Sequence, residues 1–160
     1  MKKISKGFSL IELLIVVAII LIIAAIAIPN LLRSRIAANQ ASAVGSLRTL
    51  NTAEITYSST YNVGFSQTMA NLQPPTGTAN PTSTAAGLID SILAAGSKSG
   101  YSFTYAPGSS DSTGRINTYS FNAAPITSST GTNYYFTDQS GVIRQNSTSG
   151  AAATDSPIAG

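Results

Sequence analysis

The chain has 160 residues, of which 43% are hydrophobic and only 9% are charged, a length that leaves room for one folded domain beside a membrane segment. It contains no cysteine and no histidine, which excludes disulfides, thiolate nucleophiles, Cys/His zinc sites, Ser-His-Asp triads and histidine acid–base catalysis. Lys2, Lys3 and Lys6 account for the formal net charge of +3, because the other six basic residues balance six acidic ones, and this balance argues against nucleic-acid binding.

An apolar segment follows the basic leader. Residues 13–28 are all apolar, and the stretch that starts at residue 8 is interrupted only by Ser9 and Glu12. Because about 20 helical residues cross a hydrocarbon core of ~30 Å, this segment predicts a membrane-spanning helix. The lysines before it place the rest of the chain outside the cytoplasm. A cleaved secretory signal peptide, with its shorter apolar core and small-residue cleavage site, is the alternative. Three alanines keep it open: Ala24, Ala25 and Ala27.

Glu12 does not fit an ordinary membrane anchor. A carboxylate costs ~2.5–3.5 kcal/mol at the centre of a membrane helix and less near its ends, so its presence indicates a function or a partner. In the simplest interpretation, Glu12 only reaches to the lipid headgroups beside Lys6. In the other interpretation, Glu12 has a functional role and a partner for its charge.

The sequence KKISKGFSLIELL at residues 2–14 resembles the class III signal of type IV prepilins and type II secretion pseudopilins. The resemblance is close over residues 1 to about 60 and loose beyond them. It implies that a prepilin peptidase cuts after Gly7 on the cytoplasmic side and that Phe8, the new N-terminus, is N-methylated. It also implies that Glu12, the fifth residue after the cut, meets the N-terminal amine of a neighbouring subunit during assembly.

Pro29 interrupts the helical pattern at the end of the apolar run. Proline removes a backbone hydrogen bond and clashes with the preceding turn, so Pro29 either ends or kinks the helix. The resemblance favours a kink, because pilins carry a proline at the matching position. Beyond it, an apolar face with the period of a helix predicts one continuous helix over residues 9–58. The residues of this face are Leu32, Ile36, Ala43, Leu47, Leu50 and Tyr57.

The composition changes to Ser, Thr, Asn, Gly and Pro after residue 58. Residues 86–95 predict a short helix with an apolar face, formed by Leu88, Ile89, Ile92 and Leu93. Alternating residues predict strands at 101–105, 118–123 and 133–137, the last returning as a hairpin through 142–144. The expected core is Leu47, Leu50, Tyr57, Leu72, Tyr101, Phe103, Tyr105, Tyr119, Phe121, Tyr135 and Val142.

The predicted fold class is therefore α+β, with a long N-terminal helix packed against a small antiparallel sheet, as the resemblance to pilins also implies. The expected organisation is a leader at 1–7, a transmembrane and filament-core helix at 8–29, the amphipathic half of that helix at 30–58, a helix-to-sheet loop region at 59–100, the sheet at 101–145 and a loop tail at 146–160.

The sequence departs from the family towards its C-terminus. Many major pilins close this end with a disulfide, which a chain without cysteine cannot form, and the major pseudopilin binds calcium with clustered aspartates. Asp138 and Asp155 supply too few oxygen ligands for calcium, so neither a metal nor a cofactor is predicted. Residues 146–148 (Asn-Ser-Thr) match a glycosylation acceptor, but so short a pattern also occurs by chance.

An exported, membrane-anchored enzyme is the main rival class. Ser97 with Lys98, or Glu54 with Asp90, could carry serine–lysine or paired-carboxylate chemistry. Neither pair lies in a recognisable motif, so we interpret them as a solvated loop lysine and surface acids, and no enzyme is predicted.

The predicted function is that of a structural subunit of a type IV pilus-like filament for adhesion, motility or DNA uptake. A pseudopilin that forms a short periplasmic piston for type II secretion is the alternative. The expected partners are further copies in a helical filament, the inner membrane, the prepilin peptidase and an assembly platform. The expected location is the inner membrane, as a single-pass protein with its C-terminal domain outside the cytoplasm, and then an extracellular or periplasmic filament.

Overall fold

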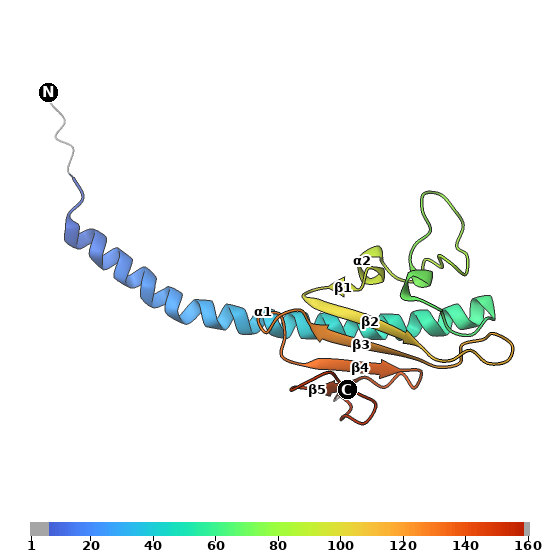
Figure 1. Cartoon of the computed structure of the whole chain (residues 1–160). Helices are drawn as coiled ribbons and strands as arrows, with labels where there is room; N and C mark the ends of the chain where they lie inside the picture. Colours follow the sequence, from blue (N-terminus) through green and yellow to red (C-terminus); the bar gives the residue numbers. More distant parts are fainter. Residues whose placement is uncertain (1–6, 159–160) are drawn as a thin grey trace. The chain divides into compact units, whose positions relative to one another are not determined.

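The computed structural model describes residues 7–158 of the chain, so Lys2, Lys3 and Lys6 of the leader lie outside the described residues. A long helix is followed by two short helical segments and then by strands (Figure 1), which confirms the predicted α+β class. The elements are α1 (Leu10–Tyr61), η1 (Met69–Leu72), α2 (Ser91–Ala94), β1 (Ser97–Lys98), β2 (Tyr101–Pro107), β3 (Tyr119–Pro125), β4 (Tyr134–Asp138) and β5 (Arg144–Asn146).

The chain divides into two compact units, Met1–Arg35 and Ile36–Gly160. In the first unit, α1 continues past Pro29, so the interpretation in which Pro29 ends the helix is wrong. Because proline has no backbone N–H, the carbonyl of Ala25 lacks the helical donor that residue 29 would otherwise supply. The kink that the resemblance implies at Pro29 stays a prediction.

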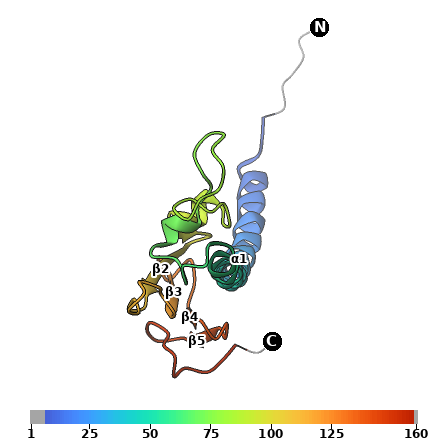
Figure 2. The same cartoon turned by 90° about the vertical axis from the view of Figure 1, so that its right-hand side faces the viewer.

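The second unit contains an antiparallel sheet with the strand order β1-β2-β3-β4-β5. Its longest ladder joins β2 to β3, from Tyr101 opposite Pro125 to Pro107 opposite Tyr119. Each strand pairs antiparallel with the next one along the chain, so the order of the strands in the sheet is their order in the sequence. Figure 2 views the part of α1 that belongs to this unit nearly along its axis and shows the sheet to one side of it.

The strands predicted at 101–105, 118–123 and 133–137 are confirmed as β2, β3 and β4, whereas the return strand predicted at 142–144 lies at Arg144–Asn146 as β5, and the structure adds the short strand β1. It pairs with β2 through Lys98 opposite Tyr101. The two residues between them, Ser99 and Gly100, have φ values of 50° and 75°. This is the conformation that a two-residue hairpin loop requires, and glycine adopts it without strain.

The core lies between one face of α1 and the inner face of the sheet. Burial alternates along β3, where Tyr119, Phe121 and Ala123 are buried. Nine of the eleven predicted core residues are buried, and Tyr105 is half-buried against the cluster. Val142 was a wrong prediction, because it is 37% exposed while the adjacent Ile143 is buried. The three residues before β5 do not form a strand, so the alternation of β4 does not continue through the turn.

The predicted helix over residues 86–95 is mostly absent, since only α2 is helical there. The backbone N–H of Ala86 donates to Asn71 O at 2.8 Å, and the N–H groups of Leu88 and Ile89 donate to Leu72 O at 2.9 and 3.1 Å. These donors are therefore used by the neighbouring segment. Ile92, assigned to the buried face, is exposed.

The long helix ends three residues later than predicted, at Tyr61. The next residue, Asn62, has a φ of 56°, a left-handed conformation that asparagine tolerates and that commonly closes a helix. Near the other end of the predicted apolar face, Leu32 is exposed.

The C-terminal tail forms a loop, as predicted, and runs beside β5. The backbone N–H of Gln145 donates to Ser156 O at 3.0 Å, and that of Ile158 donates to Ile143 O at 2.9 Å. The tail therefore covers the outer edge of the last strand, whose backbone groups could otherwise pair with another chain.

Candidate processing and assembly site

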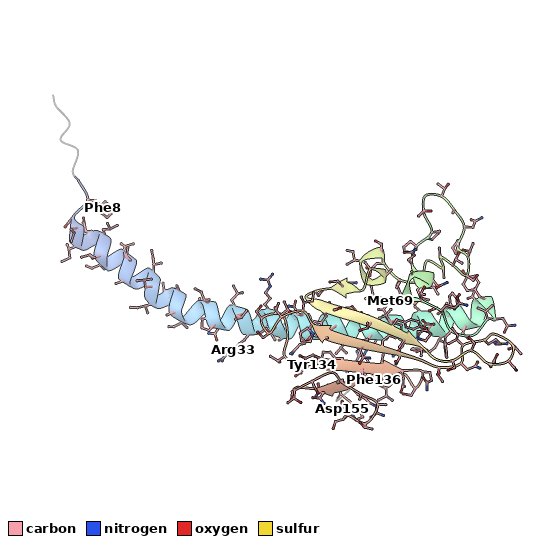
Figure 3. The ribbon with its side chains drawn as sticks, viewed as in Figure 1. Phe8, Arg33, Met69, Tyr134, Phe136 and Asp155 are labelled. Carbon is pink, nitrogen blue, oxygen red and sulfur yellow. The ribbon has the colours of Figure 1, made fainter. Side chains whose placement is uncertain are left out.

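The residues of the implied cleavage site lie just before α1. Gly7 is exposed, and Phe8 is 80% exposed. No neighbouring atom lies within 4 Å of the position that a Cβ of Gly7 would occupy. Figure 3 shows the Phe8 side chain at the start of the helix. The bond between Gly7 and Phe8 is thus open to a large partner in the single chain.

Glu12 lies in the first turn of α1. Its Oε2 accepts a hydrogen bond of 2.9 Å from the backbone N–H of Ser9. A Ser followed three residues later by a Glu is the pattern of a capping box, and this bond is one half of that motif. Helix capping is a role for Glu12 that the sequence analysis missed, although the spacing signals it. Among the residues that the structure describes, the carboxylate thus has the Ser9 N–H as a local donor and remains exposed.

The helix that follows is apolar on all its sides. Its most apolar window of 18 residues has a mean hydropathy of 3.3, and the large side chains from Leu10 to Leu32 are exposed. In Figure 3 they project around the helix. A helix that is hydrophobic all round is normally enclosed by lipid or by other helices, so this segment is long and apolar enough to cross a membrane.

These features define a prepilin-type N-terminal segment. Residues 2–28 match the family described as the prokaryotic N-terminal methylation motif. The chain therefore carries this motif at its N-terminus, and the resemblance found in the sequence is confirmed.

Two curated relatives are type IV pilus proteins. The chain is 52% identical over 50 residues to the type IV major pilin protein PilA of Myxococcus xanthus, which is 31% of this chain and 23% of the relative. It is 69% identical over 35 residues to the type IV wide pilus major component PilA4 of Thermus thermophilus, which is 22% of this chain and 27% of the relative. The chain thus spans about a quarter of the length of these relatives and is type IV pilin-like. No solved structure matches the chain significantly.

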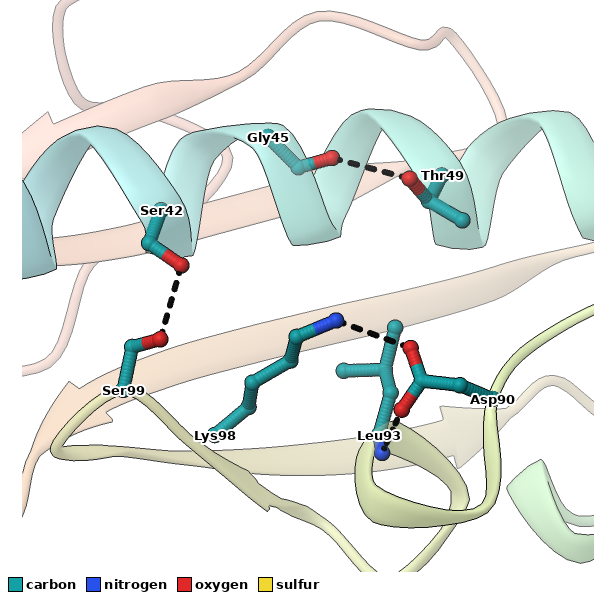
Figure 4. Close-up of polar contacts among 7 residues, drawn as sticks. All are labelled: Ser42, Gly45, Thr49, Asp90, Leu93, Lys98 and Ser99. Carbon is teal, nitrogen blue, oxygen red and sulfur yellow. Dashed lines mark hydrogen bonds and ion pairs between the residues drawn. The ribbon is translucent and has the colours of Figure 1, made fainter.

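Two of the residues considered for catalysis, Lys98 and Glu54, do not lie where the sequence analysis placed them. Lys98 lies in β1 rather than in a loop, and its Nζ forms an ion pair of 2.8 Å with Asp90 Oδ2. Figure 4 shows this pair, with Asp90 Oδ1 also accepting from the N–H of Leu93. The Lys98 ammonium, followed by the Leu93 N–H, lowers the pKa of Asp90. A second contact in Figure 4 joins the hydroxyls of Ser42 and Ser99 at 2.9 Å.

Glu54 was wrongly interpreted as a surface acid. It is 0% exposed, and it lies far along α1 from the exposed Glu12. Its Oε2 accepts from the Ser66 N–H at 2.9 Å, and its Oε1 accepts from the Ser66 hydroxyl at 2.6 Å. Burial raises the pKa of Glu54 and outweighs the opposing effect of the bonds from Ser66. Glu54 is seven residues after Leu47, so the helical period places it on the buried face.

Asn51 is a second buried polar residue that the sequence analysis did not assign to the core. Its Nδ2 donates to Thr137 Oγ1 at 2.8 Å, and its Oδ1 accepts from the Tyr119 hydroxyl at 3.1 Å. Asn51 thereby joins α1 to β3 and β4. Asn51 lies four residues after Leu47, so the helical period could again have predicted its position on the buried face.

The glycosylation pattern and the two aspartates near the C-terminus are engaged in local bonds. Asn146 Nδ2, the atom that would carry a glycan, donates to Asp155 Oδ1 at 3.1 Å. Asp155 also accepts from the Ala152 N–H at 2.7 Å, and Asp138 Oδ1 accepts from the Ser140 N–H at 2.9 Å. Over residues 7–158, no group of three or more acidic side chains that could hold a metal ion is found.

Proposed function

We propose that this chain is a structural, non-catalytic subunit of a type IV pilus. In this proposal the peptidase cleaves after Gly7, Phe8 is N-methylated, and the mature chain is stored in the inner membrane with residues 36–158 outside the cytoplasm. Subunits then leave the membrane on an assembly platform and polymerise through α1.

The observation that carries the proposal is the combination of the methylation motif with a helix that is apolar on all its sides. The apolar side chains of such a helix stay in apolar surroundings when neighbouring helices replace the lipid, so one segment can serve first as an anchor and then as a filament core. The relatives' names, both of major pilus components, favour a pilus over a secretion piston.

Glu12 gives the test of this function. Glu12→Leu removes a carboxylate from an apolar helix, so membrane insertion is unharmed or improved and cleavage after Gly7 persists. Assembly fails, because the Phe8 amine of each neighbouring subunit would be buried without its partner, at a cost of about 3–5 kcal/mol per contact. Glu12→Gln retains the shape and a hydrogen bond, and an intermediate defect is expected.

The measurement is the yield of sheared surface filaments relative to total mature subunit, with mass spectrometry of the subunit's N-terminus. Ser9→Ala is the matched control, since it leaves both the carboxylate and its backbone donor in place. Normal filaments from Glu12→Leu would refute the pairing, and an uncleaved leader or cleavage near Ala27 would refute the processing. A secretion defect without surface filaments would assign the chain to a secretion piston instead.

A further inference from the structure

Glu54 is a buried carboxylate that has no place in the assembly of the N-terminal helix. It lies in the second unit, where Ser66, a residue of the loop after α1, binds both of its oxygens. Ser66 is itself fully buried. The carboxylate therefore fastens the first part of this loop to the helix.

The same loop segment is also bound by β2 and by the connection from β2 to β3. The hydroxyl of Tyr105 on β2 donates to Ser66 O at 2.6 Å, and the Phe65 N–H donates to Ile116 O at 2.8 Å. Gly64 packs so closely on the Ile116 backbone that a Cβ would overlap it. Residues 64–66 are thus clamped between the helix and the connection from β2 to β3.

No cation balances the charge of Glu54 within the described residues, where Lys98 and Asp90 form the single ion pair. The titratable groups that face it are Tyr57 on its own helix, Tyr105 on β2 and Tyr119 on β3. Burial, followed by the charge of Glu54, raises the pKa of each of these hydroxyls, so they stay neutral below pH 10. The charge of Asp138 on β4 also raises the pKa of the Tyr119 hydroxyl.

We propose that Glu54 is a proton-controlled clamp, which holds residues 64–66 most tightly when it is protonated and releases them more readily as the pH rises. A protonated carboxyl can donate to the Ser66 hydroxyl while its other oxygen still accepts from the Ser66 N–H, so protonation retains both contacts. Ionisation adds a buried charge without a counter-ion, and such a charge is costly. Only opening of the segment gives it water.

The direction of the pH effect follows from the position of the folded-state pKa. This pKa lies above the ordinary value of 4.5. The contribution of protonated Glu54 to the stability of the closed segment is therefore fully present below pH 4.5, and it is lost as the pH rises through the folded-state pKa. One proton is released on opening. The opening equilibrium constant therefore rises by at most tenfold per pH unit and then reaches a plateau.

The experiment measures amide hydrogen exchange at Phe65 and Ser66 in the full-length chain in detergent micelles, from pH 4.5 to 8 and corrected for the intrinsic exchange rate. The wild-type opening constant is expected to rise with pH as described. Glu54→Gln retains an acceptor for the Ser66 N–H and gains a donor for its hydroxyl without any charge. Its profile is expected to be flat, with a smaller opening constant than the wild type at pH 7.

Asp90→Asn is the matched control, because Asp90 is an exposed acid whose pKa is lowered rather than raised. It should leave the profile at Phe65 and Ser66 unchanged. An opening constant of the wild type that does not change with pH overturns the proposal, and this measurement does not depend on whether any variant folds. A larger opening constant in Glu54→Gln than in the wild type at pH 7 also overturns it, since the ionised carboxylate would then be the better clamp.

Discussion

Asn51 joins the long helix to the sheet, and its replacement tests whether this buried polar contact stabilises the second unit. The side chain is 6% exposed and binds the hydroxyls of Tyr119 and Thr137. Asn51→Leu keeps a similar volume but removes the amide. Each hydroxyl then loses a buried partner at ~1–3 kcal/mol, so we expect a loss of about 3 kcal/mol in the free energy of unfolding. For a unit of this size, the corresponding fall in Tm is about 12 °C.

The loss should come from the two hydroxyls that are left without partners. Adding Tyr119→Phe and Thr137→Val to Asn51→Leu removes both hydroxyls and makes the site apolar. Because replacing all partners by apolar groups of similar shape is nearly neutral, the triple variant should return to within about 1 kcal/mol of the wild type. The three changes are therefore strongly non-additive, as expected for residues in direct contact.

Thermal unfolding of the full chain in detergent, followed by near-ultraviolet circular dichroism, reports on this contact. The chain has seven tyrosines and no tryptophan, and every tyrosine lies in the second unit, so the membrane helix does not obscure the signal. A fall in Tm below about 4 °C for Asn51→Leu, or a triple variant as unstable as the single one, would contradict this reasoning.

Two further matched pairs test the packing. Leu50→Ala, at a fully buried position, should lower the free energy of unfolding by about 3 kcal/mol because of the cavity that it leaves. Ile55→Ala, where the side chain is 61% exposed, should change the free energy of unfolding by no more than about 0.5 kcal/mol. Similar losses for the two variants, measured by thermal unfolding, would mean that the assigned faces of α1 are wrong. Gly131→Ala should destabilise the second unit, because a Cβ there would overlap the Tyr101 ring and hydroxyl, while Gly150→Ala meets no neighbouring atom within 4 Å; equal Tm values for the two variants would disprove the close approach at Gly131.

The sequence predicted the parts of the fold that local periodicity determines. The helical period places Leu47, Leu50 and Tyr57 on one face, and all three are buried. Strict alternation located β2 and β3 correctly. The motif at Gly7 to Glu12 was also readable, because it depends on residue types at fixed offsets rather than on tertiary contacts.

The buried polar contacts could not be predicted in the same way, because their partners are distant in the sequence. Asn51 and Thr137 are 86 positions apart, and nothing local indicates that they meet. Glu54 lies on the correct face, but its polarity led us to place it at the surface. The predicted helix near residue 90 failed for a related reason, since Leu72 O accepts the backbone donors that the helix would have used.

The long helix thus carries two carboxylates in opposite situations, and the contrast bears on how subunits could join. Both oxygens of Glu54 are bound by Ser66 in a buried site, so a second chain cannot reach it without opening the loop. Glu12 is exposed, and the bond that it accepts from the Ser9 N–H within residues 7–158 leaves lone pairs for another donor. If the bond after Gly7 is cut, as we propose, the amine of Phe8 becomes a donor of the required charge. If a carboxylate of α1 pairs with a neighbouring subunit, the geometry therefore leaves that role to Glu12.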